Sequence, residues 1–402
     1  MINVAILGYG TVGSGVFKII NANNRHISRR AGEDIKVKYV LDLRDFPGDP
    51  VEEVLVHDVN VIMEDEEVDV VAEVMGGVEP AYTFVKTALL AGKSACTSNK
   101  ELVAKHGAEL LKIAAEKKVN FFFEASVGGG IPVIRPLSEC LTVDHLEEIE
   151  GIMNGTTNYI LTKMEDEGAD FDEVLKDAQN KGYAERNPEA DIEGYDACRK
   201  IAILSSLAYE KQVDFEDIYT EGISKITTED FKYMKKIGAS IKLLGLARRD
   251  GKVLYSMVAP FVVYQDNPLY SIKDVFNAIL VKGDMLGDVM FYGKGAGSLP
   301  TASAVVSDVV DAVKRKGETA KILWSSEKIE LGSVDAFTTP YFVRIKGTGI
   351  ESEISKCFGD VKYIEGGDEL GETAFVTNVM SGSEFEAASK DFDIVSRIRV
   401  SE

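Results

Sequence analysis

The sequence has few cysteines, and no two of them stand close enough to form a CxxC pair. A structural zinc site or a disulfide framework requires clustered or regularly spaced cysteines, so neither organises this chain. Scattered single thiols are typical of a reduced, cytosolic protein. The four are Cys96, Cys140, Cys198 and Cys357.

Long hydrophobic runs are also missing. No apolar segment approaches the roughly 18 residues that a membrane helix needs. The apolar run Val4–Leu7 breaks at once into glycines, so we expect no secretory signal peptide. We therefore expect a cytoplasmic protein without a membrane partner.

Positive charge is scarce relative to negative charge. The chain carries 45 Lys and Arg against 66 Asp and Glu, a formal net charge of −21. This excess of acid argues against nucleic acid and anionic membranes as partners. With 402 residues, 45% hydrophobic and 28% charged, the chain has the composition of an ordinary globular protein and the length for two or three domains.

A glycine-rich turn near the N-terminus is the first motif. The apolar run Ile2–Leu7 predicts a strand, and the apolar spacing that follows the glycines predicts a helix. A GxGxxG between a strand and a helix is typical of dinucleotide binding, because the helix N-terminus offers N–H groups to a pyrophosphate. The predicted cofactor contacts here are Gly8, Gly10, Thr11, Val12 and Gly13.

The next predicted strand, Ile35–Leu41, ends at an acidic residue. Asp42 could bond the ribose hydroxyls of NAD, although it lies farther from the glycines than the usual spacing of about 20 residues. Arg44 follows closely and could instead meet the 2′-phosphate of NADP. The sequence therefore leans towards NAD without excluding NADP.

Further strands and helices alternate up to Glu124, which predicts an α/β, Rossmann-type domain with a parallel sheet. Ligands bind beyond the carboxyl ends of such strands. A lysine there is a site candidate, although an exposed helix-start lysine would be about as common. The candidates at predicted strand ends are Gly76, Ser98, Lys100 and Glu124.

Two other glycine-rich segments leave their role open. Ala125–Pro132 (ASVGGGIP) could approach a cation, a cofactor or only form a tight bend. Tyr292–Val305 is rich in small residues and opens a helix that we expect to return to the first domain. Between them, Asp144–Met153 and Val253–Val263 predict strands, and Ile272–Ala278 predicts a helix, which together indicate an α+β substrate domain.

The stretch Ala178–Lys200 packs five carboxylates into an ordered loop with Asn-Pro and single glycines. The apolar spacing turns helical after Tyr195, so Asp196 and Lys200 stand at i and i+4 on one helix face. Alone, this pattern would be read as a solvated acidic loop with a helix-stabilising ion pair.

Several blocks then occur together in one order. They are GYGTVG, EVMGGVEPAY, TSNK, EASVGGGIP, NGTTNYI, the acidic loop AQNKGYAERNPEADIEGYDACRK, and FYGKGAGSLPTASAV. In these blocks the chain resembles the homoserine dehydrogenase family over essentially residues 1–320. The resemblance implies NAD(P)-dependent interconversion of homoserine and aspartate 4-semialdehyde, in threonine and methionine biosynthesis, by a homodimer or homotetramer.

The resemblance also implies site residues by position. Lys100 and Lys200 would serve the reacting oxygen, with Lys200, steered by Asp196, as the main proton relay. Gly297 would contact the cofactor through its backbone. The amino acid would be bound by Tyr183, Glu185, Asp191, Asp196 and Lys200. A monovalent cation, Na⁺, would be held by the Glu124 carboxylate and backbone carbonyls at Val127, Gly129 and Ile131.

The chemistry of the substrate agrees with these residue types. Its ammonium needs carboxylates, and hydride transfer to the aldehyde places negative charge on an oxygen that needs a cation or proton donor within about 3 Å.

Two other interpretations of the whole chain remain. It could be another semialdehyde or amino-acid dehydrogenase on the same scaffold, or a non-catalytic sensor of amino acid and nucleotide.

The C-terminal segment follows a predicted linker, 321–340. Its predicted order, β-α-β-β-α-β over 341–402, resembles an ACT domain, which in long homoserine dehydrogenases is linked to threonine feedback. The first loop here, Lys346–Gly349, lacks the acidic residue and Pro-Gly pair usual in that module. A module that only pairs sheets between subunits is an equal alternative. The predicted domains are 1–135, joined by helix 298–320, then 136–297 and 341–402.

Overall fold

The structure is a computed structural model that describes residues 1–401, apart from the side chain of Asp368. The chain forms two compact units. The first comprises Met1–Asp144, Ala202–Phe215 and Phe291–Ile329, and the second comprises His145–Ile201, Glu216–Met290 and the stretch from Glu330 on. Among the described residues, no helix combines the length and apolar character needed to cross a membrane.

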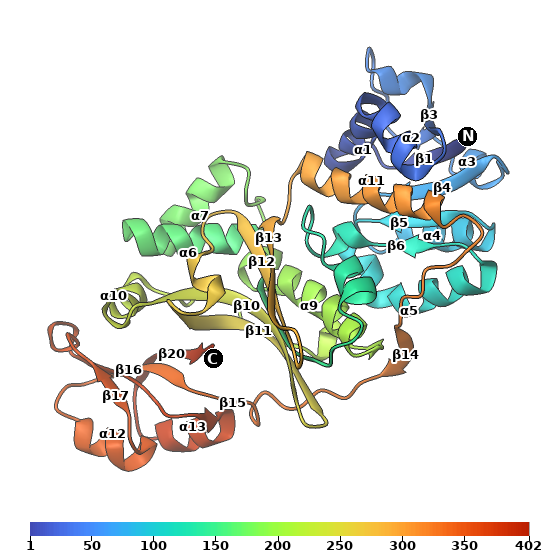
Figure 1. The fold of residues 1–402 in the computed structure, drawn as a ribbon. Helices are drawn as coiled ribbons and strands as arrows, with labels where there is room; N and C mark the ends of the chain where they lie inside the picture. Colours follow the sequence, from blue (N-terminus) through green and yellow to red (C-terminus); the bar gives the residue numbers. More distant parts are fainter. Residues whose placement is uncertain (402) are drawn as a thin grey trace. The chain divides into compact units, whose positions relative to one another are not determined.

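A parallel six-stranded sheet forms the centre of the first unit (Figure 1). Its strands are β1 (Ile2–Leu7), β2 (Ile35–Leu41), β3 (Leu55–Val56), β4 (Val68–Glu73), β5 (Ser94–Thr97) and β6 (Phe121–Phe122). They lie in the order β3-β2-β1-β4-β5-β6. This is the strand order of the dinucleotide-binding fold, in which β2 and β3 lie on one side of β1 and β4 to β6 lie on the other. The predicted Rossmann-type domain is therefore confirmed.

Helices cover both faces of this sheet. They are α1 (Thr11–Ala22), α2 (Asn24–Ala31), α3 (Asn60–Met63), α4 (Ala81–Leu90), α5 (Lys100–Lys117) and α11 (Ser298–Lys314). Val16 of α1 and Val305 of α11 share one core with Ile6, while Ala88 of α4 packs with Leu7 on the other face. Side chains of a buried parallel strand alternate between two apolar layers, which explains its nearly continuous apolar sequence. The returning helix predicted from Tyr292–Val305 is therefore present as α11.

Long antiparallel strands form the centre of the second unit. They are β7 (Leu146–Ile152), β10 (Ala239–Asp250), β11 (Val253–Tyr264) and β12 (Phe276–Gly283), in the order β12-β7-β10-β11. Helices α6 (Gly155–Glu167) and α10 (Thr228–Ile237) contact β10. The acidic segment lies among α7 (Phe171–Asn180), the short α8 (Glu189–Ile192) and α9 (Tyr195–Ala208). The predicted mixture of antiparallel strands and helices is confirmed.

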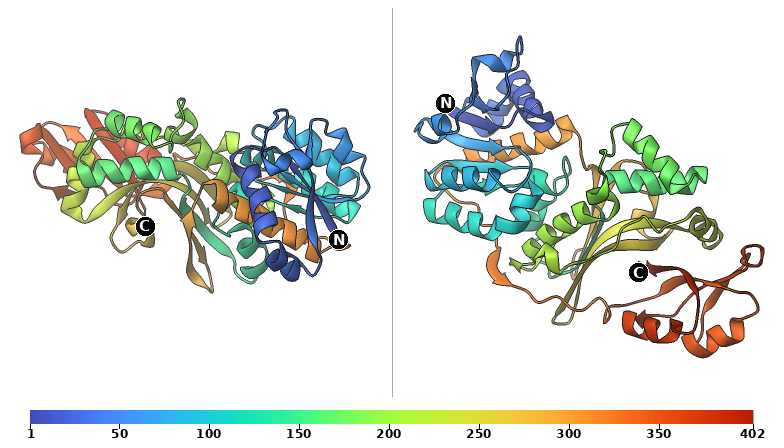
Figure 2. Two further views of the ribbon diagram at one scale, coloured as in Figure 1. Left: turned by 90° about the horizontal axis from the view of Figure 1, so that it is seen from above. Right: turned by 180° about the vertical axis from the view of Figure 1, so that it is seen from behind.

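The C-terminal part of the second unit has its own small core. Its elements are β16 (Tyr341–Lys346), α12 (Glu351–Phe358), β17 (Lys362–Ile364), β18 (Glu372–Val376), α13 (Gly382–Ser389) and β20 (Ile394–Val400). The strands are antiparallel in the order β20-β16-β18-β17. Phe358 and Phe385 bring both helices to one face of these strands (Figure 2). The predicted β-α-β-β-α-β order is present, and its identity as an ACT domain stays a prediction.

The last strand joins this C-terminal module to the larger sheet. Val400 of β20 pairs in parallel with Val262 of β11, so a single sheet runs through the unit. Arg344 of the module, almost fully buried, forms ion pairs with Asp230 of α10 and with Glu372. Backbone pairing and buried charge therefore both hold the module in place.

Two predicted elements differ from the structure. The predicted helix Ile272–Ala278 is wrong, because a 3₁₀ turn at Pro268–Ser271 is followed by β12, which pairs with β7. The Asn267 side chain caps that turn, and pairing with a buried strand then overrides the short helical spacing. The predicted linker contains two short strands, Ser325–Lys328 and Thr338–Thr339, which pair elsewhere in the chain. The remaining domain boundaries stay predictions.

Candidate active site

The glycine turn after β1 has the backbone geometry that its sequence predicted. Gly8 has a φ of +101°, which L side chains rarely adopt. A Cβ at Gly13 would overlap the carbonyl oxygen of Gly8, whereas one at Gly10 would meet no atom within 4 Å. Helix α1 starts directly afterwards, at Thr11, without a side-chain cap, so its first N–H groups are available to an anion.

Asp42, at the end of β2, faces this turn. Its carboxylate accepts hydrogen bonds from Tyr9 N at 2.9 Å and from the Arg44 guanidinium at 2.9 and 3.0 Å. These bonds, above all those from Arg44, hold the pKa of Asp42 well below its usual range. The structure thus brings together the glycine turn, Asp42 and Arg44, which the sequence assigned to the pyrophosphate, the ribose hydroxyls and the 2′-phosphate of NADP; Arg44 is 63% exposed.

A buried carboxylate joins the next two strand ends. Glu73, 0% exposed at the end of β4, accepts hydrogen bonds from Met75 N at 2.7 Å and from the Thr97 hydroxyl at the end of β5. Burial raises its pKa to about 7. Gly76 and Ser98 lie in the two loops that follow these strands, and Lys100 is the first residue of α5. Sequence reasoning did not select Glu73, although an acid inside the apolar run VDVVAEVM was a usable signal.

The side chain of Glu124 accepts hydrogen bonds from a backbone bend. Its carboxylate accepts the backbone N–H groups of Val133, Ile134 and Arg135 at 2.6, 2.7 and 2.9 Å. A carboxylate has about four acceptor positions, and the Arg135 guanidinium lies 3.4 Å from it. Backbone donors therefore occupy most of the acceptor positions of this carboxylate, and its role as a cation ligand stays a prediction. Arg135 also pairs with Asp308, whose pKa burial raises to about 8.

The glycine triplet beside Glu124 forms a tight backbone approach. Gly129 has a φ of +58°, and a Cβ there would overlap the Gly295 carbonyl. Close packing of two chain segments therefore explains this glycine. Within residues 1–401, no group of three His, Cys, Asp or Glu side chains could hold a metal ion. Cation binding by the backbone carbonyls of Val127, Gly129 and Ile131 stays a prediction.

The acidic loop of the second unit forms a buried polar cluster. Lys200 Nζ lies 2.7 Å from Asp196 Oδ2 and donates to the Met153 carbonyl at 2.7 Å. Asn154 Nδ2 donates to Asp191 at 2.7 Å and to Asp196 at 2.9 Å. The side chains of Lys200 and Asp196 are only 11% and 8% exposed. The predicted i, i+4 contact is present, and one amide bridges both carboxylates.

Asn154 is the residue of this cluster that sequence reasoning missed. Its Oδ1 accepts the Thr157 N–H at 2.9 Å and so caps α6, while its Nδ2 holds the two aspartates. The segment NGTTN indicated a turn with polar donors, but it did not indicate their partners. Two predicted substrate residues, Tyr183 and Glu185, belong to the same acidic loop. Tyr183 is 45% exposed. Glu185 is also exposed, and its backbone carbonyl accepts a hydrogen bond from the Gln179 side chain.

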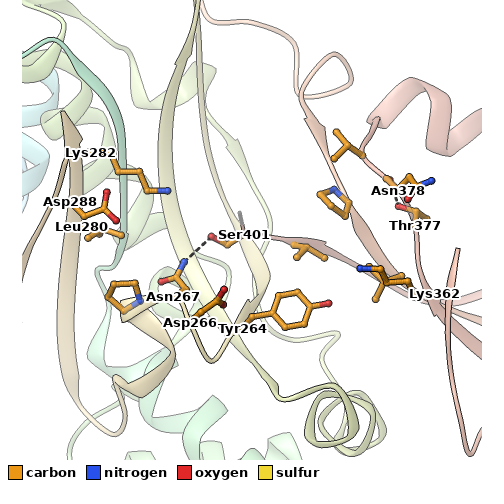
Figure 3. A pocket seen from close by; sticks show the side chains of 15 residues that line it. Tyr264, Asp266, Asn267, Leu280, Lys282, Asp288, Lys362, Thr377, Asn378 and Ser401 are labelled. Atoms are coloured by element: carbon orange, nitrogen blue, oxygen red, sulfur yellow. Dashed lines mark hydrogen bonds between the residues drawn. The ribbon is translucent and has the colours of Figure 1, made fainter. Parts of the chain in front are cut away.

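A separate cavity of about 490 Å³ lies between the C-terminal module and the larger sheet of the second unit (Figure 3). Lys282 and Asp288 line one side, and Lys362 and Thr377 line the other. Ser401 donates to the buried Glu150 of β7 at 2.8 Å. Both signs of charge thus face one space beside the module.

Comparison with known proteins identifies both parts. The family model of the homoserine dehydrogenase NAD-binding domain matches residues 8–124, and that of homoserine dehydrogenase matches residues 132–310. The homoserine dehydrogenase of Bacillus subtilis is 40% identical over 423 aligned residues, covering 99% of this chain and 97% of the relative. That of Helicobacter pylori is 40% identical and covers 88% of this chain and 84% of the relative.

Two solved structures agree over the full length of the chain, and a third agrees over part of it. The homoserine dehydrogenase from Thiobacillus denitrificans superposes with a TM-score of 0.91 at 36% identity, covering 100% of this chain and 98% of that one. The S. aureus enzyme has a TM-score of 0.84 at 33% identity, covering 100% and 98%. A hyperthermophilic archaeal mutant enzyme, solved with NADPH, has a TM-score of 0.65 at 29% identity, covering 77% of this chain and 97% of that one. The chain therefore belongs to the homoserine dehydrogenase family, NAD(P)-dependent oxidoreductases that act on a CH–OH group.

Proposed function

We propose that Lys200 gives and takes the proton on the reacting oxygen when homoserine and aspartate 4-semialdehyde are interconverted. The observation that carries this role is its buried setting between Asp196 and the Met153 carbonyl. A lysine ammonium has three N–H donors, and these two acceptors occupy two of them. The third donor is left for the substrate oxygen, in a site where little water competes for it.

The amino-acid end of the substrate would be bound by the same loop. Its ammonium requires carboxylate acceptors, and Asn154 holds Asp191 and Asp196 within reach of one donor. Tyr183 and Glu185 border them in sequence and are exposed, so they are free of the buried cluster. We assign them to contacts with the backbone end of the amino acid.

Bound NAD(P)H supplies the hydride for this reaction. The chain would hold the pyrophosphate at the glycine turn and α1, as the backbone there supports. Gly76, Ser98 and Gly297 would approach the rest of the cofactor, and Lys100 would add a second cation near the reacting oxygen. We propose NAD as the preferred cofactor through Asp42, with NADP accepted because Arg44 can leave Asp42 for the 2′-phosphate.

Replacing Lys200 tests the proton role. Lys200→Ala should lower kcat about a thousandfold, because proton transfer is lost, while the dissociation constant of NADH stays within about twofold. Both quantities are measured by homoserine-dependent reduction of NAD or NADP and by cofactor fluorescence. The matched control is Lys232→Ala, an exposed lysine of α10 paired with Glu229. Turnover near the wild-type level in Lys200→Ala would refute the role.

The pathway, the oligomeric state and the monovalent cation are assigned from family membership. Membership supports a place in threonine and methionine biosynthesis and assembly as a homodimer or homotetramer. The scattered cysteines support a cytoplasmic location. Native mass spectrometry would decide between dimer and tetramer. For the monovalent cation, the proposed ligands are the Glu124 carboxylate and the backbone carbonyls of Val127, Gly129 and Ile131, and activity in Na⁺-free buffer tests them.

The C-terminal module is proposed to be a threonine-responsive ACT-like module, with an assembly role as the alternative. The polar cavity beside it supports an effector, since Lys362 could receive a carboxylate and Asp288 an ammonium. The departure of Lys346–Gly349 from the usual ligand loop supports the assembly role. Threonine titration of the purified full chain separates them: unchanged activity at millimolar threonine leaves the assembly role.

A further inference from the structure

Glu73 is a buried carboxylate that the proposed chemistry does not use. It is 0% exposed, and its carboxylate is bonded by neutral groups: Met75 N, the Thr97 hydroxyl and the Asn99 side chain. Burying a carboxylate without a cation is unfavourable, and an apolar residue of similar size would usually give a more stable core. Its presence at this position therefore calls for a reason other than stability.

The position of Glu73 supplies that reason. It is the last residue of β4 and lies opposite Thr97, the last residue of β5, at the carboxyl edge of the parallel sheet. Ligands of such sheets bind beyond this edge. The loops that leave the two strands carry Gly76, Ser98 and Lys100, which are proposed cofactor or catalytic residues.

Hydrogen bonds connect Glu73 to both loops. On one side it fixes Met75 N, and Ser98 N donates to its backbone carbonyl at 3.3 Å. On the other side the Thr97 hydroxyl, which donates to Glu73, accepts the N–H of Asn99 at 2.9 Å. The carboxylate thus organises the residues on either side of the space where the two loops diverge.

Asn99 extends this network to Lys100. Its Nδ2 donates to the Gly77 carbonyl at 2.6 Å, and its Oδ1 accepts the Leu102 N–H at 3.1 Å, which caps α5. Lys100 is the first residue after this cap. The direction in which α5 starts, and with it the backbone position of Lys100, therefore depends on the Glu73–Thr97–Asn99 chain of hydrogen bonds.

The geometry points to Glu73 as a positioning residue that, through Thr97 and Asn99, holds Lys100 and the Gly76 loop in the arrangement needed for hydride transfer. This inference rests on the proposed role of Lys100. In this role Glu73 contacts neither substrate nor cofactor, and it acts only through the two loops.

Glu73→Gln is the most direct test. A glutamine amide offers one acceptor and one donor group, so either Met75 N–H or the Thr97 hydroxyl would face an N–H donor. The two loops should shift, and kcat should fall about tenfold to a hundredfold, with the KM for homoserine within about twofold. The matched control is Lys93→Met. Lys93 is also buried and bonds the Asp65 and Val68 carbonyls beside the same strands, but at their amino end. It should leave kcat unchanged.

A double-mutant cycle separates positioning from a general structural defect. If Glu73 acts through Lys100, adding Glu73→Gln to Lys100→Ala should lower kcat by less than about twofold further. Equal, fully additive losses in both backgrounds would overturn the inference, as would wild-type kcat in Glu73→Gln. If Glu73→Gln does not fold, Thr97→Val, which keeps the carboxylate and removes its link to Asn99, takes its place in the cycle.

Hydrogen exchange keeps this test independent of the reaction. In Glu73→Gln the amides of residues 75 and 99 should exchange at least about tenfold faster, and those of the Lys93→Met control should not. Loss of protection together with no homoserine turnover in the wild-type protein would refute the proposed function and leave the network standing. Wild-type protection at both amides would refute the network, whatever the enzyme turns over.

Discussion

The two units each carry an aspartate bound by a nearby basic residue, and the two pairs differ in burial. Asp42 and Arg44 form a pair at 2.9 Å in which Asp42 is 10% exposed but Arg44 is 63% exposed. Asp196 and Lys200 form a pair at 2.7 Å in which both side chains are about nine-tenths buried. Water competes for the first pair, so its strength is low and a ligand can rearrange it. The second is held by further hydrogen bonds from Asn154 and to Met153, and breaking it would leave a buried charge.

This difference suits the two tasks. A cofactor site that discriminates between a ribose hydroxyl and a phosphate benefits from a pair that can open. A site that must place one proton within hydrogen-bonding distance of a reacting oxygen benefits from a pair that cannot. Changes to the buried pair should therefore alter kcat strongly, whereas changes to the exposed pair should alter selectivity modestly.

The strongest way to break the comparison is to loosen the buried pair without touching either charge. Asn154→Ala removes the amide that bridges Asp191 and Asp196, and kcat should fall about a hundredfold with cofactor affinity unchanged. The same change removes the cap of α6, at about 1 kcal/mol. Ser381→Ala, which removes the capping residue of α13, should lower the free energy of unfolding similarly and leave kcat intact. Equal kcat values in the two variants would show that burial alone fixes the pair.

The exposed pair is tested by cofactor selectivity. Arg44→Ala leaves Asp42 able to accept the ribose hydroxyls of NAD and to repel a 2′-phosphate, so the kcat/KM ratio of NADP to NAD should fall about tenfold. Arg30→Ala, an exposed arginine of α2, is the control and should leave the ratio unchanged. An unchanged ratio in Arg44→Ala would place cofactor choice elsewhere on the first unit.

A buried lysine whose ammonium donates a hydrogen bond to a backbone carbonyl sharpens the comparison. Lys242, 0% exposed on β10, donates to the Ile272 carbonyl at 2.7 Å, and burial lowers its pKa to about 8 from 10.5. Below pH 8 both folded and unfolded chains carry this proton, and burial of the charge destabilises the fold by up to about 3 kcal/mol. Between pH 8 and 10.5 the folded chain releases it first, so this contribution to stability rises with pH.

Lys242→Met should therefore raise the free energy of unfolding at pH 7 by about 2 kcal/mol, after loss of the carbonyl bond. The gain should vanish by pH 10.5. Denaturant unfolding at both pH values measures it. A gain of equal size at both would assign the effect to packing and not to the charge. Glu165, Asp166, Lys273 and Asp274 face the same region and are unchanged in the variant.

Local patterns were sufficient for much of the fold. The strand, glycine turn and helix at the N-terminus, the i, i+4 contact of Asp196 with Lys200, and the β-α-β-β-α-β order of the C-terminal module were all predicted and are present. Each depends on residues a few positions apart, where spacing alone sets which side chains share a face. The predicted helix over Ile272–Ala278 is wrong, because the sequence of so short a segment does not reveal pairing with β7.

The site was predictable in its charged residues and not in its hydrogen-bond partners. Spacing predicted the contact of Lys200 with Asp196 and the family resemblance selected both for the site, whereas Asn154 lies 42 positions from Asp196 and looked like an ordinary turn residue. Glu124 was a site candidate because it ends a predicted strand, and the family resemblance assigned it to a cation. Only the fold reveals that the backbone N–H groups of the following bend occupy its carboxylate.

The sequence by itself determined most of the secondary structure and the family, and it nominated the ionisable residues of the site, because these depend on local spacing and on motifs read in order. The tertiary structure decided which carboxylates are available. It places Glu73 among neutral donors, surrounds the Glu124 carboxylate with the N–H groups of a backbone bend, and pairs the largely buried Asp42 with the exposed Arg44. The physical reason is that the strength and use of a charge depend on burial and on partners far away in the chain, which only the folded chain brings together.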